Sequence, residues 1–471
     1  MHNRVLYFIV IYLLSVNYLQ SAEVVMTESD FLKIVGKNHP LVKQANLQIQ
    51  KGQSTLLKAK GAFDPTIVAN YDNKTFEDKS YYEILSTGLK IPIWYGPELN
   101  FAYQSSSGNY LNPENNLPDK GLVSAGIKMP LGQGLFFDNR RAAFRQAEIF
   151  DKISTVEQIR YLADLYYDAI DVYWNWSAAY MKLKLNEEIL KISKVRFEGI
   201  KQSFVQGDIP AIDTLETYLQ ILNFEMNLQS ARYEYINSGL NLSNFLWNEN
   251  LIPLEVSENL IPFNDSQPKV RAMDDVKLLT NNIDSLLNIH PELEVYNLKL
   301  ENLQVERRLK AEYLKPKLDL KYDYLNNAVD INTNELYPER NYKIGIDFKM
   351  PLFLRNERGD VQLTDIKIAE TEIQIQSKRL ELKNKINSYL NEIEILSSNF
   401  ELFTNALQNY RILFEAEQIK FNSGESSLFL LNSRENSLLN AGIKQIDLFA
   451  KINSKYAALR WSLGILGKEM N

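Results

Sequence analysis

The sequence predicts a mixed α and β membrane protein built from one unit that occurs twice. Residues 342–350 alternate strictly between apolar side chains and small or charged ones, as in a strand with one apolar and one aqueous face. The Lys-Met-Pro-Leu sequence at 349–352 also occurs at 128–131. Two long stretches without proline, 140–204 and 357–421, predict very long helices. Together these features indicate a duplicated unit of strands and long helices.

The composition narrows the class of protein. The chain has 471 residues, of which 45% are hydrophobic and 24% charged, and a formal net charge of −7. This mild acidity argues against nucleic-acid binding. The chain contains no cysteine, which excludes disulfides, thiolate metal sites and an acylated N-terminal cysteine.

The first 22 residues have the layout of a signal peptide. Arg4 precedes an apolar run over residues 5–14, and the small residues Ser21 and Ala22 follow. A membrane anchor is the alternative, but the apolar run is shorter than the roughly 20 residues that a membrane-spanning helix needs. We therefore expect residues 1–22 to direct export.

The two halves of the mature chain correspond residue by residue. His39-Pro40 matches His290-Pro291 at an offset of 251, and from Asn139, which matches Asn356, the offset is 217. Identities held at a fixed offset indicate an internal duplication. The predicted repeats span 23–248 and 290–466, separated by a connector at 249–289 and followed by a tail at 467–471.

Each repeat reads as a helix, strands, a long helix, a turn and a return helix. The first helices are expected at about 40–62 and 291–313, and the strands within 66–131 and 318–352. The long helices end near the tip glycines Gly207 and Gly424, and the return helices run to about Trp247 and Trp461. Apolar positions such as Ile153, Val156 and Ile159 form narrow stripes, which are typical of coiled-coil seams.

The first repeat contains an additional hairpin at about 84–104. Its two segments, 84–91 and 99–104, alternate with period two and are separated by Tyr95-Gly96-Pro97, which is a turn signal. We expect the hairpin in the membrane wall, and the alternative is a hairpin folded over the channel mouth or against a neighbouring chain.

The strands of one chain are too few to enclose a membrane barrel. Such barrels begin at about eight strands, and open sheet edges are not tolerated in lipid. The chain supplies between four and six strands, so closure requires several chains.

Several short motifs recur in duplicate and in order. They are the two His-Pro pairs, Met129-Pro130-Leu131 with Met350-Pro351-Leu352, and the turns at 204–207 and 421–424. In these motifs, and along nearly all of its mature length, the chain resembles the TolC family of outer-membrane efflux proteins. The resemblance implies a homotrimer that forms an outer-membrane β-barrel continued by a periplasmic α-helical barrel.

The resemblance also implies partners and a function. We expect a passive exit duct in the outer membrane, with porin activity, which serves a tripartite efflux or type I secretion system. Its partners would be a periplasmic adaptor and an inner-membrane pump or translocator. Gly207 and Gly424 would mark the periplasmic tips where partners dock, and 249–289 would belong to an equatorial region. The simple family pattern has two strands per repeat, or twelve in a trimer; the additional hairpin would give eighteen.

Two carboxylates after the first tip are candidates for lining the channel mouth. Asp213 and Glu216 are three residues apart and share a helix face. They serve either as favourable charge at a helix start or as a solvated face, or they form a negative ring that favours cations. The family carries gating carboxylates at equivalent places in the second repeat, where this chain has Leu430 and Ser433.

No catalytic or metal-binding motif is found. The chain has three histidines, and the two outside the signal segment occupy equivalent His-Pro pairs, which favours a structural role at a helix entry. We therefore expect no enzyme activity, no cofactor and no metal site. The alternative function is a periplasmic structural coiled coil or adaptor, in which the strands would form a soluble domain.

Overall fold

The computed structural model describes residues 24–257, 259–263, 276, 283–328 and 340–469. The predicted signal peptide and much of the predicted connector lie outside the described residues. The elements, in chain order, are β1 (Val24–Met26), α2 (Glu28–Asn38), α3 (Pro40–Lys60), η1 (Gly61–Phe63), β2 (Thr66–Phe76), β3 (Lys79–Pro92), β4 (Glu98–Ser107), η2 (Pro113–Asn115), β5 (Leu122–Pro130), α4 (Asn139–Gln206), α5 (Ala211–Ser243), β6 (Leu260–Pro262), α7 (Ile283–Asn288), α8 (Pro291–Glu312), β7 (Lys317–Asn327), β8 (Tyr342–Lys349), α9 (Arg355–Asn422), α10 (Leu428–Ser462) and α11 (Leu466–Glu469).

The chain forms two compact units, and each contains parts of both repeats. The helical unit comprises Met1–Asn46, Ile159–His290 and Leu380–Asn471, and the sheet unit comprises Leu47–Gln158 and Pro291–Arg379. The long helices α4 and α9, of 68 residues each, contribute to both units. The predicted mixed fold of long helices and antiparallel hairpins is confirmed.

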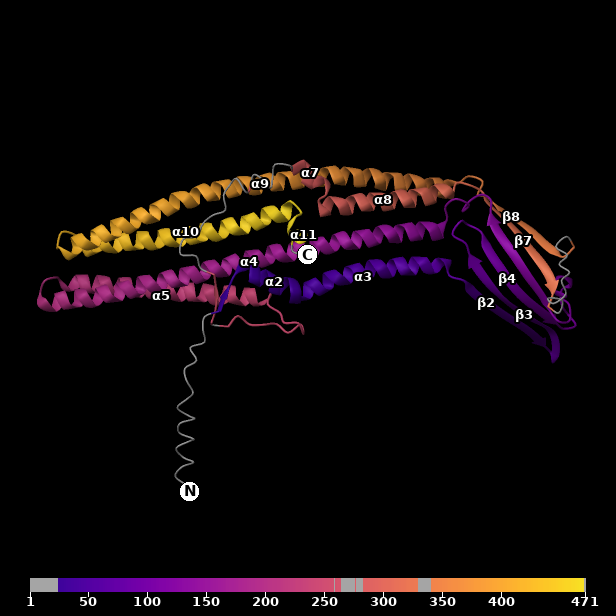
Figure 1. Ribbon diagram of the computed structural model, residues 1–471, viewed down its shortest axis with the longest axis horizontal. Helices are drawn as coiled ribbons and strands as arrows, with labels where there is room; N and C mark the ends of the chain where they lie inside the picture. The colour runs from indigo at the N-terminus through magenta and orange to yellow at the C-terminus, as the bar shows by residue number, and fades with distance from the viewer. Residues whose placement is uncertain (1–23, 258, 264–275, 277–282, 329–339, 470–471) are drawn as a thin grey trace, which may run out of the picture. The chain divides into compact units, whose positions relative to one another are not determined.

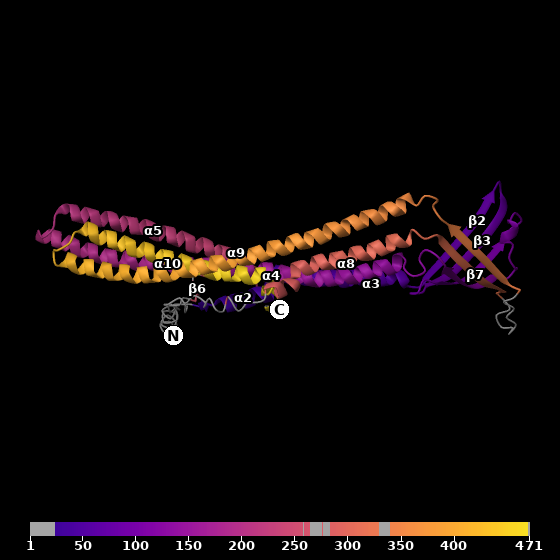
Figure 2. The ribbon, with the colours of Figure 1, turned by 90° about the horizontal axis from the view of Figure 1, so that it is seen from above.

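The sheet unit contains one antiparallel sheet of six strands in the order β2-β3-β4-β5-β7-β8 (Figures 1 and 2). Strands β5 and β7 join the two repeats, with Ile127 opposite Tyr322. Within the second repeat, β7 pairs with β8 and places Leu320 opposite Ile346. The two repeats therefore continue each other in one layer.

The additional hairpin of the first repeat lies inside this sheet. Strand β3 pairs with β2, and β4 pairs with both β3 and β5. Both strands are longer than the sequence pattern predicted, because the ladder continues past the alternating residues. In the described chain the first repeat thus supplies four strands of the sheet and the second repeat two.

The two faces of the sheet differ in chemistry, because side chains alternate across each strand. One face carries Ile344, Ile346 and Phe348 on β8, and these side chains are exposed. The opposite face carries the ion pairs Lys321–Asp347 at 2.5 Å and Lys128–Asp319 at 3.3 Å. The apolar and polar faces predicted for 342–350 are therefore seen in β8, which covers all but the last residue of this range.

The helical unit has a continuous core where its first segment meets the long helices. Phe31, Tyr173 and Trp176 are buried together with Leu242 and Leu466. The Tyr173 hydroxyl donates a hydrogen bond to the Met26 carbonyl at 3.0 Å. Burial raises the pKa of Tyr173 above its ordinary value, so the phenol stays protonated and remains a donor.

In the described part of the chain, no helix combines the length and the apolar character that a membrane-crossing helix requires.

Candidate functional site

The two tip turns have the same backbone structure. Gly207 and Gly424 adopt positive φ angles of 82° and 73°, a conformation that strains residues with a side chain. In the first turn, the Gly207 and Asp208 amides donate to the carbonyls of Phe204 and Ser203, both at 3.0 Å. The second turn repeats these bonds, from Gly424 to Phe421 and from Glu425 to Lys420. Each long helix therefore ends in a Schellman motif with glycine at its left-handed position.

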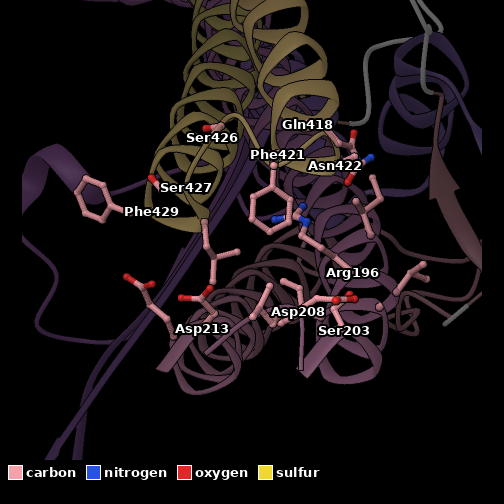
Figure 3. A pocket seen from close by; sticks show the side chains of 18 of the residues that line it. Arg196, Ser203, Asp208, Asp213, Gln418, Phe421, Asn422, Ser426, Ser427 and Phe429 are labelled. Carbon is pink, nitrogen blue, oxygen red and sulfur yellow. The ribbon is translucent and has the colours of Figure 1, made fainter. Parts of the chain in front are cut away.

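An open cavity of about 1050 Å³ lies between the two helical hairpins beside these turns. Figure 3 shows Arg196, Asp208 and Asp213 from the α4–α5 hairpin, and Phe421 and Asn422 near the end of α9. The predicted site residues Asp213, Glu216 and Gly424 all line this cavity. Gly207 is not among its lining residues, although the adjacent Asp208 is.

Acidic side chains outnumber basic ones around this cavity. Asp213 and Glu216 are joined there by Asp208 and Glu188, whereas the basic lining residues are Lys191 and Arg196. Both predicted carboxylates are partly exposed, so water reaches them. Asp213 lies in the first turn of α5, where the helix dipole favours a negative charge. The arrangement can therefore attract cations or basic side chains.

A buried ion pair connects the two hairpins beside this cavity. Arg196 on α4 donates to both oxygens of the Glu435 carboxylate on α10, with Nη1 at 2.9 Å from Oε2. The Glu435 side chain is 0% exposed and that of Arg196 is 8% exposed. The guanidinium also lies 5.7 Å from the centre of the Phe414 ring, which favours a cation–π contact. Such a bidentate geometry is typical of Arg–carboxylate pairs.

The sequence alone does not predict this ion pair, although the position of Glu435 carries a signal for it. Glu435 follows the buried Leu428 and Leu431 and precedes the buried Leu439, at the three- and four-residue spacing of a coiled-coil seam. A charged residue at such a position requires a partner. The partner cannot be read from local sequence, since Arg196 is 239 residues away.

The histidine of the first His-Pro pair is buried and packs against an aromatic ring. His39 is 7% exposed, its ring stacks on Phe245 at 5.7 Å, and its Nδ1 accepts a hydrogen bond from the Leu41 amide at 3.2 Å. Burial lowers the pKa of His39, which favours the neutral ring. Among the residues that the structure describes, no group of three or more His, Asp or Glu residues could hold a metal ion.

The comparisons with known proteins give one family match and several matches to solved structures. Residues 282–465 match the sequence profile of the family described as outer membrane efflux protein. No curated protein sequence matches the chain.

Solved structures share the fold of almost the whole chain at low sequence identity. The CmeC outer membrane channel of Campylobacter jejuni aligns with a TM-score of 0.64 and 12% identity, covering 96% of this chain and 90% of that one. The outer membrane protein VceC of Vibrio cholerae aligns with a TM-score of 0.64 and 13% identity, covering 93% and 96%. The MtrE outer membrane channel of Neisseria gonorrhoeae aligns with a TM-score of 0.64 and 11% identity, covering 93% of this chain and 89% of that one. The profile match therefore covers the second repeat, and the fold shared along almost the whole chain is that of solved outer membrane channels.

Proposed function

We propose that three copies of this chain form a passive exit duct, which receives its cargo from a periplasmic adaptor and an inner-membrane pump or translocator. Its sheet would lie in the outer membrane and its helical tips in the periplasm. The observation that carries the proposal is the amphipathic six-stranded sheet, whose two edges are unpaired among the described residues.

The apolar face of the sheet favours contact with lipid. Ile67 on β2 and Phe348 on β8 are 79% and 67% exposed. Ile344 and Ile346 on β8 and Phe101 on β4 are exposed as well. A contiguous exposed apolar surface of this kind marks a membrane or protein contact. The ion-paired opposite face suits a water-filled lumen.

The edges of the sheet favour closure by identical copies. Strands β2 and β8 each pair on one side only within the described chain. Because every pairing in the sheet is antiparallel, β2 and β8 run in opposite directions. The β8 edge of one copy can therefore pair antiparallel with the β2 edge of the next, which continues the sheet without an edge exposed to lipid.

The helical tips supply a surface for partners. The acidic cavity between the hairpins includes the apolar side chains of Phe421 and Phe429, and Val205 beside it is 80% exposed. In a passive duct, the choice of cargo would belong to the adaptor and the pump. We assign no catalytic role to the carboxylates of the tip.

The assembly is tested by native mass spectrometry of the protein purified from membranes in detergent. We expect the mass of a trimer and discrete channels in planar bilayers. A folded monomer in detergent would contradict the proposal. A protein that stays soluble without detergent would favour the adaptor-like alternative.

The partners are tested with a photo-crosslinking amino acid at Val205. We expect capture of a membrane-anchored periplasmic adaptor, identified by mass spectrometry. The matched control carries the same group at Leu57, an exposed residue of α3 in the sheet unit. Equal capture at both positions would argue against docking at the tip.

A further inference from the structure

Among the residues that the structure describes, the β3–β4 hairpin has no counterpart in the second repeat. There β7 and β8 are direct partners, whereas in the first repeat β3 and β4 stand between β2 and β5. The hairpin therefore changes the number of strands that one chain contributes.

The hairpin carries both faces of the sheet without interruption. Ile67 of β2 is opposite Leu89, Leu89 is opposite Phe101, and Phe101 is opposite Ala125 of β5. These four residues form one row on the apolar face. On the polar face, Lys90 lies opposite Asn100 and Asn100 opposite Gly126. A hairpin folded against another part of the protein would not need this continuity.

The turn of the hairpin is fixed to the ends of the neighbouring helices. The Trp94 ring lies 4.7 Å from the Phe63 ring, just after α3, and 4.9 Å from the Phe144 ring of α4, at an angle of 88° to the latter. Arg140 at the start of α4 pairs with Glu98 at 3.4 Å. A side chain at Gly96 would approach the Leu135 carbonyl to 3.2 Å. The additional strands are thus joined to the helices as well as to the sheet.

The loop beneath this turn is itself held by the first turn of α4. Arg141 donates hydrogen bonds to the carbonyls of Leu135 and Phe136, at 3.1 and 2.9 Å, and forms an ion pair with Asp138 at 3.1 Å. The guanidinium is largely buried, so these bonds replace its hydration. The loop that the hairpin turn contacts is therefore held in place by Arg141.

We propose that the β3–β4 hairpin sets the width of the barrel. This inference rests on the trimer of the proposed function: three copies close a barrel of eighteen strands instead of the twelve that two strands per repeat would give. Since barrel diameter grows roughly linearly with strand number, the diameter rises by a factor of about 1.5. Barrels of this size leave an aqueous channel, and the hairpin adds Lys90, Glu98 and Asn100 to its inner wall.

The test is deletion of residues 79–107, which removes β3 and β4 and keeps the loop before β5. The registers place Ile67 and Ala125 in one row, so β2 can pair directly with β5 and keep its apolar side chains on the same face. We expect both proteins to form trimeric channels. Cryo-electron microscopy should show eighteen strands in the full chain and twelve in the deletion variant. Polyethylene glycols added on the extracellular side should be excluded from the variant at a smaller polymer size.

A full-length trimer with twelve wall strands would overturn the inference while leaving the proposed function intact. An unchanged barrel diameter after the deletion would do the same. Failure of the full chain to form trimers would instead overturn the proposed function itself.

A second measurement uses the full-length protein and tests the inference even where the deletion variant does not fold. Spin labels are placed at Phe101 and, as a matched control, at the adjacent Asn100 of the full-length protein. We expect lipid-soluble relaxation agents to reach the label at 101 and aqueous agents to reach the label at 100. Access of aqueous agents alone to both labels would overturn the inference.

Discussion

The two helical hairpins end in the same turn and then differ. Both turns place a glycine at positive φ and repeat the same two backbone hydrogen bonds. Beyond them, Asp213 and Glu216 in the first hairpin correspond to Leu430 and Ser433 in the second. The ion pair differs likewise, since the counterparts of Arg196 and Glu435 at the 217-residue offset are Leu413 and Tyr218.

This contrast distinguishes the backbone structure that both helical hairpins need from the side chains that occur in only one of them. The backbone of the turn is fixed by the need to cap a long helix, so both repeats keep it. The side chains around it face different neighbours after duplication. In the first hairpin, Phe197 packs on Tyr218 at 5.9 Å. In the second hairpin the equivalent residues are Phe414 and Glu435, and Arg196 of the first repeat contacts both.

The largest expected effect comes from breaking this unduplicated ion pair. Glu435→Ala leaves the Arg196 charge buried without its carboxylate, which should cost about 3–5 kcal/mol of unfolding free energy. Denaturant unfolding in detergent measures the loss. The double variant Arg196→Met with Glu435→Leu should recover most of it, because it removes both charges. A single-variant loss below about 1 kcal/mol would show that water reaches the pair.

The next largest effect is expected from a charge placed on the apolar face of the sheet in each repeat. Phe101→Arg in the first repeat and Ile344→Arg in the second should each cost roughly 2–4 kcal/mol at a lipid-facing midplane position. Insertion into outer-membrane lipid and resistance of the folded protein to heat give the measurement. Asn100→Arg is the control on the polar face. A cost as large at 100 as at 101 would contradict the assignment of the faces.

The tip turns should respond alike in both repeats. Gly207→Ala and Gly424→Ala should each cost about 1–2 kcal/mol, because an L-residue is strained at positive φ. Space is not the cause, since a Cβ at either position meets nothing within 4 Å. Thermal unfolding of the two variants gives the comparison, with Gly199→Ala as a helical control that should stabilise the chain slightly. Unequal losses at 207 and 424 would mean that the turns are not equivalent.

The smallest effect on stability and the sharpest on selectivity should come from the carboxylates. Asp213→Asn with Glu216→Gln should lower the preference for cations, because it removes two negative charges per chain from the cavity. Reversal potentials across a salt gradient measure this preference. Leu430→Asp with Ser433→Glu should raise it, which makes the second repeat resemble the first. Unchanged reversal potentials in both variants would assign Asp213 and Glu216 to a solvated helix face.

Local patterns in the sequence predict those parts of the fold that local interactions determine. The alternation of 342–350 marks β8, and the glycine after a long proline-free stretch marks each tip. The place of Asp213 and Glu216 on one side of α5 also follows from their spacing. The ends of β3 extend beyond the alternating residues because its partner strands, which no local pattern reveals, prolong the ladder.

Long-range pairings could not be predicted in the same way. The sequence left open whether the additional hairpin joins the sheet, because its apolar residues could be buried by lipid or by protein. The contact between Arg196 and Glu435 depends on how the two hairpins pack. The sequence of neither helix predicts this contact, because the residues at the equivalent positions of the other repeat, Leu413 and Tyr218, carry no charge.

The unbroken row from Ile67 to Ala125 has an evolutionary consequence. A hairpin adds two strands, so its gain or loss leaves the inward and outward residues of every flanking strand unchanged, whereas one added strand would reverse the direction of the chain that follows. A single in-frame insertion or deletion could therefore alter the bore of the proposed assembly without any compensating point mutation in the remaining strands. Barrel size in such a lineage would change in discrete steps of two strands per chain, which the proposed threefold assembly would convert into steps of six.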